Sequence, residues 1–250
     1  MKQKGIDTMM FLEDAQLFLN ELNDMLSMPT IDNLFNHLSK EEQENSKSSW
    51  RLLCEKKINR NTINENTEII DIYRHGSAYT VLINQIILPL LLQKRGMQYS
   101  NEYYRIDVIG YKNGLKNDLK EKGKELKLTP YCWEFRYAIE HENNIGEWID
   151  EAIKLAYIKC PYKIIIGYNR PVDEEKGERN SLDLNKKCFN YLFECLDRSH
   201  VPKKDNKLII FFGIRNKKGA WDKIQYEGYV VDYCEKKVYD LRDLKNFALK

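Results

Sequence analysis

The segment Tyr162–Tyr168 constrains the fold most, because its sequence, YKIIIGY, is nearly continuously apolar. A strand with one solvated face alternates apolar and polar residues, whereas a continuously apolar strand is buried on both faces. A helical pattern at Glu147–Ile158 precedes this strand, and Pro161 separates the two. Such a strand lies inside a parallel or mixed sheet that has helices on both sides. We therefore expect a layered α/β fold with a mixed sheet.

The first part of the chain is predicted to be helical. Apolar residues recur with a period near 3.6 over Phe11–Leu22, which is the pattern of one buried helix face. Pro29 ends this helix, and two shorter helices are expected before the Asn-rich stretch Asn59–Thr67, which is typical of a loop. We therefore expect a helical N-terminal segment, residues 1–75, followed by an α/β core, residues 76–250.

The most apolar stretch, Ala78–Leu92, is predicted to be a buried core helix. It contains Asn84, Gln85 and Pro89, and it is shorter than the roughly 20 apolar residues that span a bilayer. Residues 1–14 lack the apolar region of a secretory signal. We therefore expect a cytoplasmic protein with no membrane partner.

Composition removes several classes of function but leaves the partner open. The 40 basic and 38 acidic residues give a net charge of +2, so any surface for nucleic acid must be local. The six cysteines form no CxxC pair, which argues against a zinc ribbon and against a secreted disulfide scaffold. The sequence also lacks a Walker A loop, a GxGxxG or GxSxG motif and an HExxH motif.

Two strands are expected between the apolar helix and the Glu147–Ile158 helix. Tyr103–Tyr111 is rich in β-branched and aromatic residues, and Tyr131–Glu142 alternates in polarity. A lysine-rich connection, residues 112–127, is expected to be a solvated excursion, with a phosphate-binding arm beside the active site as the alternative. In the second strand we expect Trp133, Phe135, Tyr137 and Ile139 on one face and Arg136, Ala138, Glu140 and Glu142 on the other.

Three carboxylates on these strands are candidate metal ligands. Glu140 and Glu142 are separated by one residue, so they project from the same face about 6.5–7 Å apart. Asp107 lies in the other strand, with apolar neighbours on both sides in sequence. Converging carboxylates repel each other unless a cation neutralises them, and oxygen-only ligands suit Mg²⁺ or Mn²⁺. If the two strands pair, the pattern predicts a divalent-cation site.

These strands resemble a known family. Arg105–Gly110 (RIDVIG) followed by Tyr137–Asn143 (YAIEHEN) resembles the metal-site strands of the PD-(D/E)XK nuclease superfamily. The helices and the apolar strand around them come where the restriction-endonuclease-like αβββαβ core of that superfamily places its own. The resemblance covers residues 77–169, and it implies that Asp107 and Glu140 are the two acidic metal ligands.

The resemblance departs from the family at Glu142, which stands where the family usually has lysine. Some type II restriction endonucleases look similar in having glutamate there, but the change also occurs in members without activity. Lys154, on the following helix, is the candidate that returns a positive charge to the site.

The resemblance implies a nuclease that uses Mg²⁺ or Mn²⁺ to hydrolyse DNA phosphodiester bonds, with RNA left open as a substrate. Its catalytic residues would be Asp107, Glu140, Glu142 and Lys154, the three acids holding the metal. A homodimer is expected by analogy only, since cutting both strands often needs two sites. Two alternatives stay open: an inactive nuclease-like module that binds nucleic acid or protein, and a structural protein assembled through its helical N-terminal segment.

Overall fold

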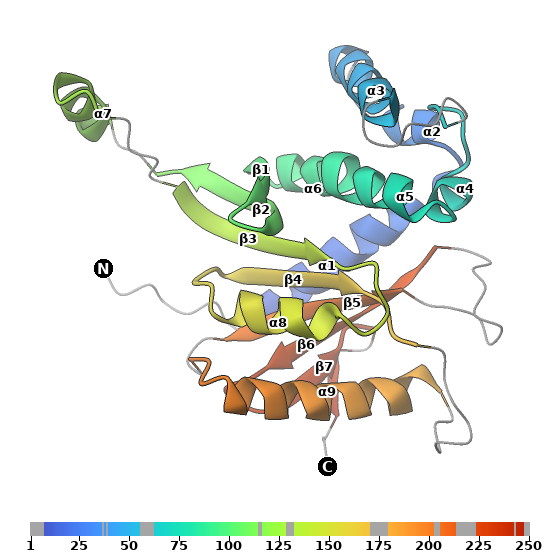
Figure 1. Ribbon diagram of the computed structural model, residues 1–250, viewed down its shortest axis with the longest axis vertical. Coiled ribbons are helices and arrows are strands. Elements are labelled where there is room, and N and C mark those ends of the chain that lie inside the picture. The colour runs from blue at the N-terminus through green and yellow to red at the C-terminus, as the bar shows by residue number, and fades with distance from the viewer. Residues whose placement is uncertain are drawn as a thin grey trace.

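The computed structural model describes residues 8–36, 38, 40–55, 63–114, 117–128, 133–170, 180–202, 206–213, 224–242 and 244–247. Within these residues the protein is a mixed α/β structure around one eight-stranded sheet, whose strands lie in chain order (Figure 1). The expected layered α/β class with a mixed sheet is confirmed. The strands are β1 (Gln98–Tyr103), β2 (Ile106–Asn113), β3 (Trp133–His141), β4 (Tyr162–Gly167), β5 (Lys207–Gly213), β6 (Tyr226–Asp232), β7 (Lys237–Asp240) and β8 (Lys245–Phe247).

The centre of the sheet is parallel and its flanks are antiparallel. Strands β3, β4 and β5 run parallel, whereas each of the other neighbouring pairs is antiparallel. A parallel connection needs a crossover, and the helices α8 (Trp148–Ala156) and α9 (Ser181–Arg198) make the two crossovers. All six residues of β4 are buried, as its apolar sequence predicted.

Helices cover both faces of the sheet. The helix α1 (Thr8–Leu26) packs on one face, together with α5 (Gly76–Leu82) and its continuation, whereas α8 and α9 pack on the other (Figure 1). Ile164 of β4 belongs to the first hydrophobic cluster and Ile165 to the second, so the central strand separates the two cores. The apolar face predicted for α1 is confirmed by the burial of Phe11, Leu12, Ala15, Phe18, Leu19 and Leu22.

Three short helices follow α1 before the central helix of the core. They are α2 (Ile31–Phe35), α3 (Lys40–Leu53) and α4 (Ile69–Tyr73). Their buried residues join the same hydrophobic cluster as α1 and the sheet. The helical character expected of the N-terminal segment is therefore present, and its division from the core after residue 75 stays a prediction.

The apolar helix does not end at Pro89. It runs from α5 through a π-helical turn, η2 (Ile83–Ile87), into α6 (Leu88–Lys94), and the proline is the second residue of α6. A proline cannot donate to the carbonyl one turn back, and a π turn is one way to accommodate such a break. Gly76–Lys94 has the length and composition of a membrane span, but 67% of that window is buried inside the protein, as in a core helix.

The prediction of a single strand over Tyr103–Tyr111 is wrong, because a hairpin turn interrupts it. Tyr103 pairs with Ile106 across the turn, so β1 and β2 are joined by Tyr104 and Arg105 alone. Two-residue hairpin turns usually carry glycine or asparagine, and here neither residue gives that signal. The turn therefore adds β1 as a strand that the sequence pattern did not predict.

A β-bulge in β3 also corrects the predicted alternation. Gly110 pairs with Tyr137 but Tyr111 pairs with Phe135, which leaves Arg136 as an extra residue. An extra residue reverses the side on which all preceding side chains lie. Tyr137 and Ile139 therefore pack in the α1 cluster, whereas Trp133 and Phe135 pack against the α8 cluster instead of sharing one face with them.

The sequence pattern predicts a last strand at Tyr229–Tyr233, most of which the structure contains as part of β6 (Tyr226–Asp232). The sheet extends beyond this strand, because β7 and β8 follow it as antiparallel neighbours. Both added strands are short, so their sequences hold too few residues for a clear alternation.

Gly167 at the end of β4 is a position where a side chain has no room. A Cβ atom there would lie 2.9 Å from the Cβ of Trp148, the first residue of α8. We expect Gly167→Ala to lower the free energy of unfolding by about 1–3 kcal/mol, because overpacking displaces α8 from the sheet. Urea unfolding measures the change. Gly76→Ala is the matched control, since no atom lies within 4 Å of a Cβ there, and equal stability of the two variants would contradict this packing.

Candidate active site

Two of the predicted acids lie opposite each other on adjacent strands. Val108 pairs with Ile139, so Asp107 and Glu140 are the next pair in the same register. Glu140 Oε2 accepts a hydrogen bond from the backbone N–H of Asp107 at 3.4 Å, and Asp107 Oδ2 accepts one from the N–H of His141 at 2.8 Å. Each carboxylate is thus fixed by the neighbouring strand.

Lys154 on α8 reaches the same place. Its Nζ lies 2.5 Å from Glu140 Oε1 and forms a second ion pair with Glu151, one turn earlier on the helix. The same Nζ donates a hydrogen bond of 2.8 Å to the carbonyl oxygen of Arg105 in the β1–β2 turn. The sequence expectation that Lys154 returns a positive charge beside Glu140 agrees with this geometry.

Burial dominates the ionisation of both acids. The Glu140 side chain is 4% exposed, and its pKa is raised to about 8, chiefly by burial and also by the charges of Asp107 and Glu151, against the opposing effect of Lys154. Burial likewise raises the pKa of Asp107, against the His141 N–H and the charge of Lys154. One lysine therefore does not offset the burial of two adjacent carboxylates, so ionising both calls for additional positive charge.

The π-helical turn contributes a polar residue that the sequence reasoning did not place in the site. The buried side chain of Asn84 lowers the pKa of Asp107, against the larger effect of burial. The adjacent Gln85 accepts a hydrogen bond of 2.7 Å from Asn101 on β1. The sequence signal for this position was the pair of amide side chains in an otherwise apolar helix, because buried polar side chains need hydrogen-bond partners.

Glu142 is placed differently from the other two acids. It follows the end of β3, and its Oε1 accepts a hydrogen bond of 2.6 Å from the backbone N–H of Asn144. In the part of the chain that the structure describes, no three His, Cys, Asp or Glu side chains are grouped closely enough to hold a metal between them. The structure thus brings Asp107, Glu140 and Lys154 together and turns Glu142 into the following loop.

His141, between the two glutamates in sequence, is a buried core residue. Burial lowers the pKa of its imidazole to about 3, and its Nε2 lies 3.5 Å from the Tyr168 hydroxyl. That hydroxyl continues through Tyr226 to Tyr79 by hydrogen bonds of 2.5 Å and 2.8 Å. This buried chain of hydroxyl groups joins the α5 side of the core to the end of β3 that carries Glu140.

The lysine-rich connection lies away from the acids. Its helix, α7 (Asn117–Glu125), follows Asn113 at the end of β2 opposite to Asp107 (Figure 1). Six residues of strand separate these two positions by about 20 Å. The solvated helical excursion is therefore confirmed, and the position does not support an arm beside the acids. A second basic segment of the sequence, Arg215, Lys217 and Lys218, is a further candidate for this surface, and it lies outside the described residues.

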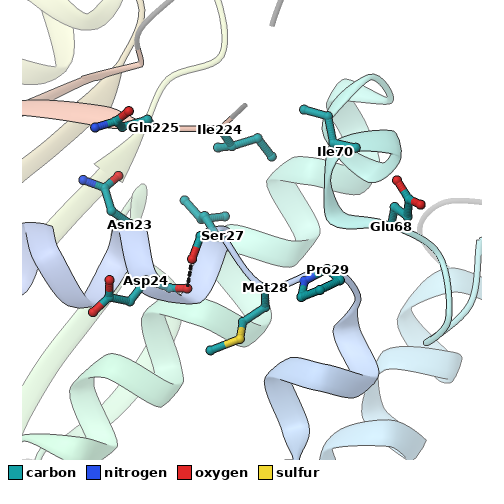
Figure 2. A pocket seen from close by; sticks show the side chains of 10 residues that line it. Asn23, Asp24, Ser27, Met28, Pro29, Glu68, Ile70, Ile224 and Gln225 are labelled. Carbon is teal, nitrogen blue, oxygen red and sulfur yellow. Dashed lines mark hydrogen bonds between the residues drawn. The ribbon is translucent and has the colours of Figure 1, made fainter. Parts of the chain in front are cut away.

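A cavity of about 510 Å³ opens at the C-terminal end of α1, away from the acids. Figure 2 shows its lining from α1, α4 and the residues before β6, with Ser27 donating a hydrogen bond to the Asp24 carbonyl oxygen. Asp107, Glu140, Glu142 and Lys154 are absent from the lining. The cavity therefore adds nothing to the candidate active site.

No protein-family model, curated protein or solved structure matches the chain. The chemistry of the site itself is therefore what indicates a function.

The raised pKa of Glu140 makes the stability of the metal-free protein depend on pH. Between pH 4.5 and about 8 the unfolded chain releases the Glu140 proton but the folded protein retains it. The free energy of unfolding should therefore fall as pH rises through this window, by up to about 1.4 kcal/mol per unit. Glu140→Gln should remove this slope.

Urea unfolding in EDTA at several pH values from 5 to 8 tests the expectation. Glu134→Gln is the control, because Glu134 lies on the same strand with its side chain 45% exposed. Parallel pH profiles for wild type and Glu140→Gln would show that burial does not govern this carboxyl group.

Proposed function

We propose that the protein is a divalent-metal-dependent nuclease of the PD-(D/E)XK type that hydrolyses DNA phosphodiester bonds. The observation that carries the proposal is the meeting of Asp107, Glu140 and Lys154 at one end of the β2–β3 pair. An aspartate, a glutamate and a lysine are the side chains of the family's motif. Here the lysine comes from α8 instead of from β3.

The order of elements supports the same proposal. The continuous helix α5–η2–α6 precedes β1, β2 and β3, and α8 and β4 follow. This is the αβββαβ order that the resemblance implied, apart from the inserted α7. In this arrangement β3 and β4 are parallel, so α8 crosses the face on which Glu140 lies and brings Lys154 to it.

Asp107 and Glu140 fit the requirements of a hard cation. Mg²⁺ is commonly held by one or two carboxylates, and waters and substrate phosphate oxygens complete its shell. The raised pKa values of both acids agree with a pair whose ionised form needs a further cation. When bound, the cation supplies an activated water and neutralises charge on the phosphate.

The protein's own residues have separate roles in this proposal. Asp107 and Glu140 bind the cation, and the backbone N–H groups of His141 and Asp107 orient their carboxylates. Asn84 of the π-helical turn favours the ionised form of Asp107 by lowering its pKa. Lys154 is partly exposed, so its ammonium group can contact a phosphate oxygen while it remains beside Glu140. Glu142 is not needed to hold the metal in this geometry.

One observation favours the alternative of an inactive nucleic-acid or protein binding module. Lys154 already forms an ion pair with Glu140, and Glu142 is engaged by the following loop. Because Glu140 is already paired with Lys154, the site has one fewer acidic group available to bind a cation than the family motif implied. The two functions differ in metal binding, which is directly measurable.

We expect Asp107→Ala and Glu140→Ala each to abolish Mg²⁺-dependent cleavage of plasmid and linear DNA. Lys154→Ala should slow it by about 10²–10³-fold, as for loss of one electrostatic contact to the reacting phosphate. Glu142→Ala should have a much smaller effect, because its carboxylate serves the loop. Glu134→Ala is the control, and circular dichroism checks the fold. Cleavage at the wild-type rate by Asp107→Ala or Glu140→Ala refutes the assignment.

Calorimetric titration with Mn²⁺ separates the nuclease from the inactive module. We expect saturable binding by the wild-type protein that is lost in Asp107→Ala and retained in Glu134→Ala. The physical reason is that only Asp107 supplies a buried carboxylate opposite Glu140. No carboxylate-dependent binding would favour the inactive module.

A further inference from the structure

The turn between β1 and β2 places an aromatic and a basic side chain in solvent beside the candidate active site. Tyr104 is 82% exposed, and Arg105 is also exposed. Both residues have left-handed backbone conformations, with φ of 49° and 63°. Residues other than glycine and asparagine rarely adopt this conformation. A turn of this type favours the sequence Asn-Gly, so Tyr-Arg makes the hairpin less stable than Asn-Gly would. Strained residues of this kind are enriched at functional sites.

Tyr104 begins a continuous line of aromatic rings on the α8 side of the sheet. The Tyr103 ring lies 4.6 Å from Tyr104, 5.1 Å from Trp133 and 5.6 Å from Phe135. The Tyr111 ring stacks on Trp133 at 4.2 Å. We name these five residues the aromatic strip. The four beyond Tyr104 are only partly buried, and they pack at the margin of the α8 cluster.

The aromatic strip begins in the turn whose backbone is bonded to Lys154 of the acid site, and it continues toward the other end of β2 and β3. Arg105 is two residues before Asp107, and its carbonyl oxygen accepts the hydrogen bond from Lys154. Along β2 and β3, Ile109 and Ala138 separate the acid pair from Tyr111 and Phe135. A polymer with one phosphate at the acids would therefore have its following units over these rings.

The charges beside the strip suit an anionic polymer with aromatic units. Within the described residues, no ion pair engages the Arg105 guanidinium group, and Lys154 provides a second cation one hydrogen bond away. At the far end of the strip, α7 carries Lys122, and Lys124 paired with Glu121, beyond Asn113. Single-stranded nucleic acid combines a phosphate backbone with exposed base faces, and proteins bind it by stacking bases on aromatic side chains near basic groups.

We infer that the aromatic strip binds unpaired nucleotides, so that the substrate is single-stranded or locally unpaired nucleic acid and not an intact duplex. In a duplex the base faces are covered by their neighbours, and exposed rings have nothing to stack on. In this arrangement Tyr104 stacks on a base next to the phosphate at the acids, and Arg105 contacts the backbone. The inference rests on the proposed function for the position of that phosphate.

Binding measured without metal tests the inference independently of cleavage. Fluorescence anisotropy in EDTA compares a labelled 20-nucleotide strand of mixed sequence with its duplex. We expect the wild-type protein to prefer the single strand, and Tyr104→Ala to bind it about 5- to 100-fold more weakly, the effect of losing one stacked base. Tyr104→Phe should retain the wild-type affinity. Tyr191→Ala is the matched control, because Tyr191 is 58% exposed on α9 and lies outside the strip.

A double variant distinguishes lost contacts from lost folding. Tyr104→Asn combined with Arg105→Gly gives the turn its preferred residues, so the free energy of unfolding should rise while the preference for the single strand disappears. Lower stability in this variant, equal binding of duplex and single strand by wild type, or unchanged binding by Tyr104→Ala would each overturn the inference.

The same samples with Mg²⁺ separate this inference from the proposed function. Tyr104-dependent binding without any cleavage would reject the nuclease and keep the strip as a nucleic-acid surface. Cleavage that needs Asp107 but is indifferent to Tyr104 would reject the strip and keep the nuclease.

Discussion

The antiparallel register of β2 against β3 determines where each candidate chemical group lies. It sets Asp107 opposite Glu140, and the two backbone N–H groups on these strands orient both carboxylates. A slip of one residue would move one acid to the α1 side of the sheet, where the core is apolar. The bulge at Arg136 limits the irregularity to the far part of β3, so the pairing at the acids is undisturbed.

Helices on both faces then fix the surroundings of this pair. The helix α8 delivers Lys154 and Glu151 from one side, and the π-helical turn delivers Asn84 from the other. Burial by these helices raises the pKa of both acids more than Lys154 lowers it. The same packing that completes the fold thus makes the site electrostatically unfavourable until positive charge is added. Electrostatically unfavourable groups of this kind are common at functional sites, where a protein loses some stability to keep a reactive arrangement.

The sequence predicted the parts of the structure in which pattern and packing agree. The periodicity over Phe11–Leu22 gave the buried face of α1, and the apolar run gave β4 as a central strand. Asp107 and Glu140 were found because isolated carboxylates in strand patterns are unusual. Three features could not be read from pattern: the β1–β2 turn lacks turn residues, the bulge has no sequence mark, and β7 and β8 are too short to alternate. Glu142 does not join Glu140 on one strand face for another reason: β3 ends at His141, so the strand alternation no longer determines the direction of the Glu142 side chain.

The π-helical turn has a consequence for how this chain tolerates changes in length. A wide turn holds one residue more than an α-helical turn, and η2 uses that extra residue ahead of Pro89. Deleting a single residue within the wide turn would close it to α-helical geometry and leave the helix on either side in phase, because the turn already absorbs the extra residue. Deleting a residue at the start of α6 would instead rotate the residues after it by about 100° and turn Leu91 and Leu92 away from the core. Changes of length are therefore tolerated differently along this helix, and the π-helical turn is where the loss of a residue disturbs the core least.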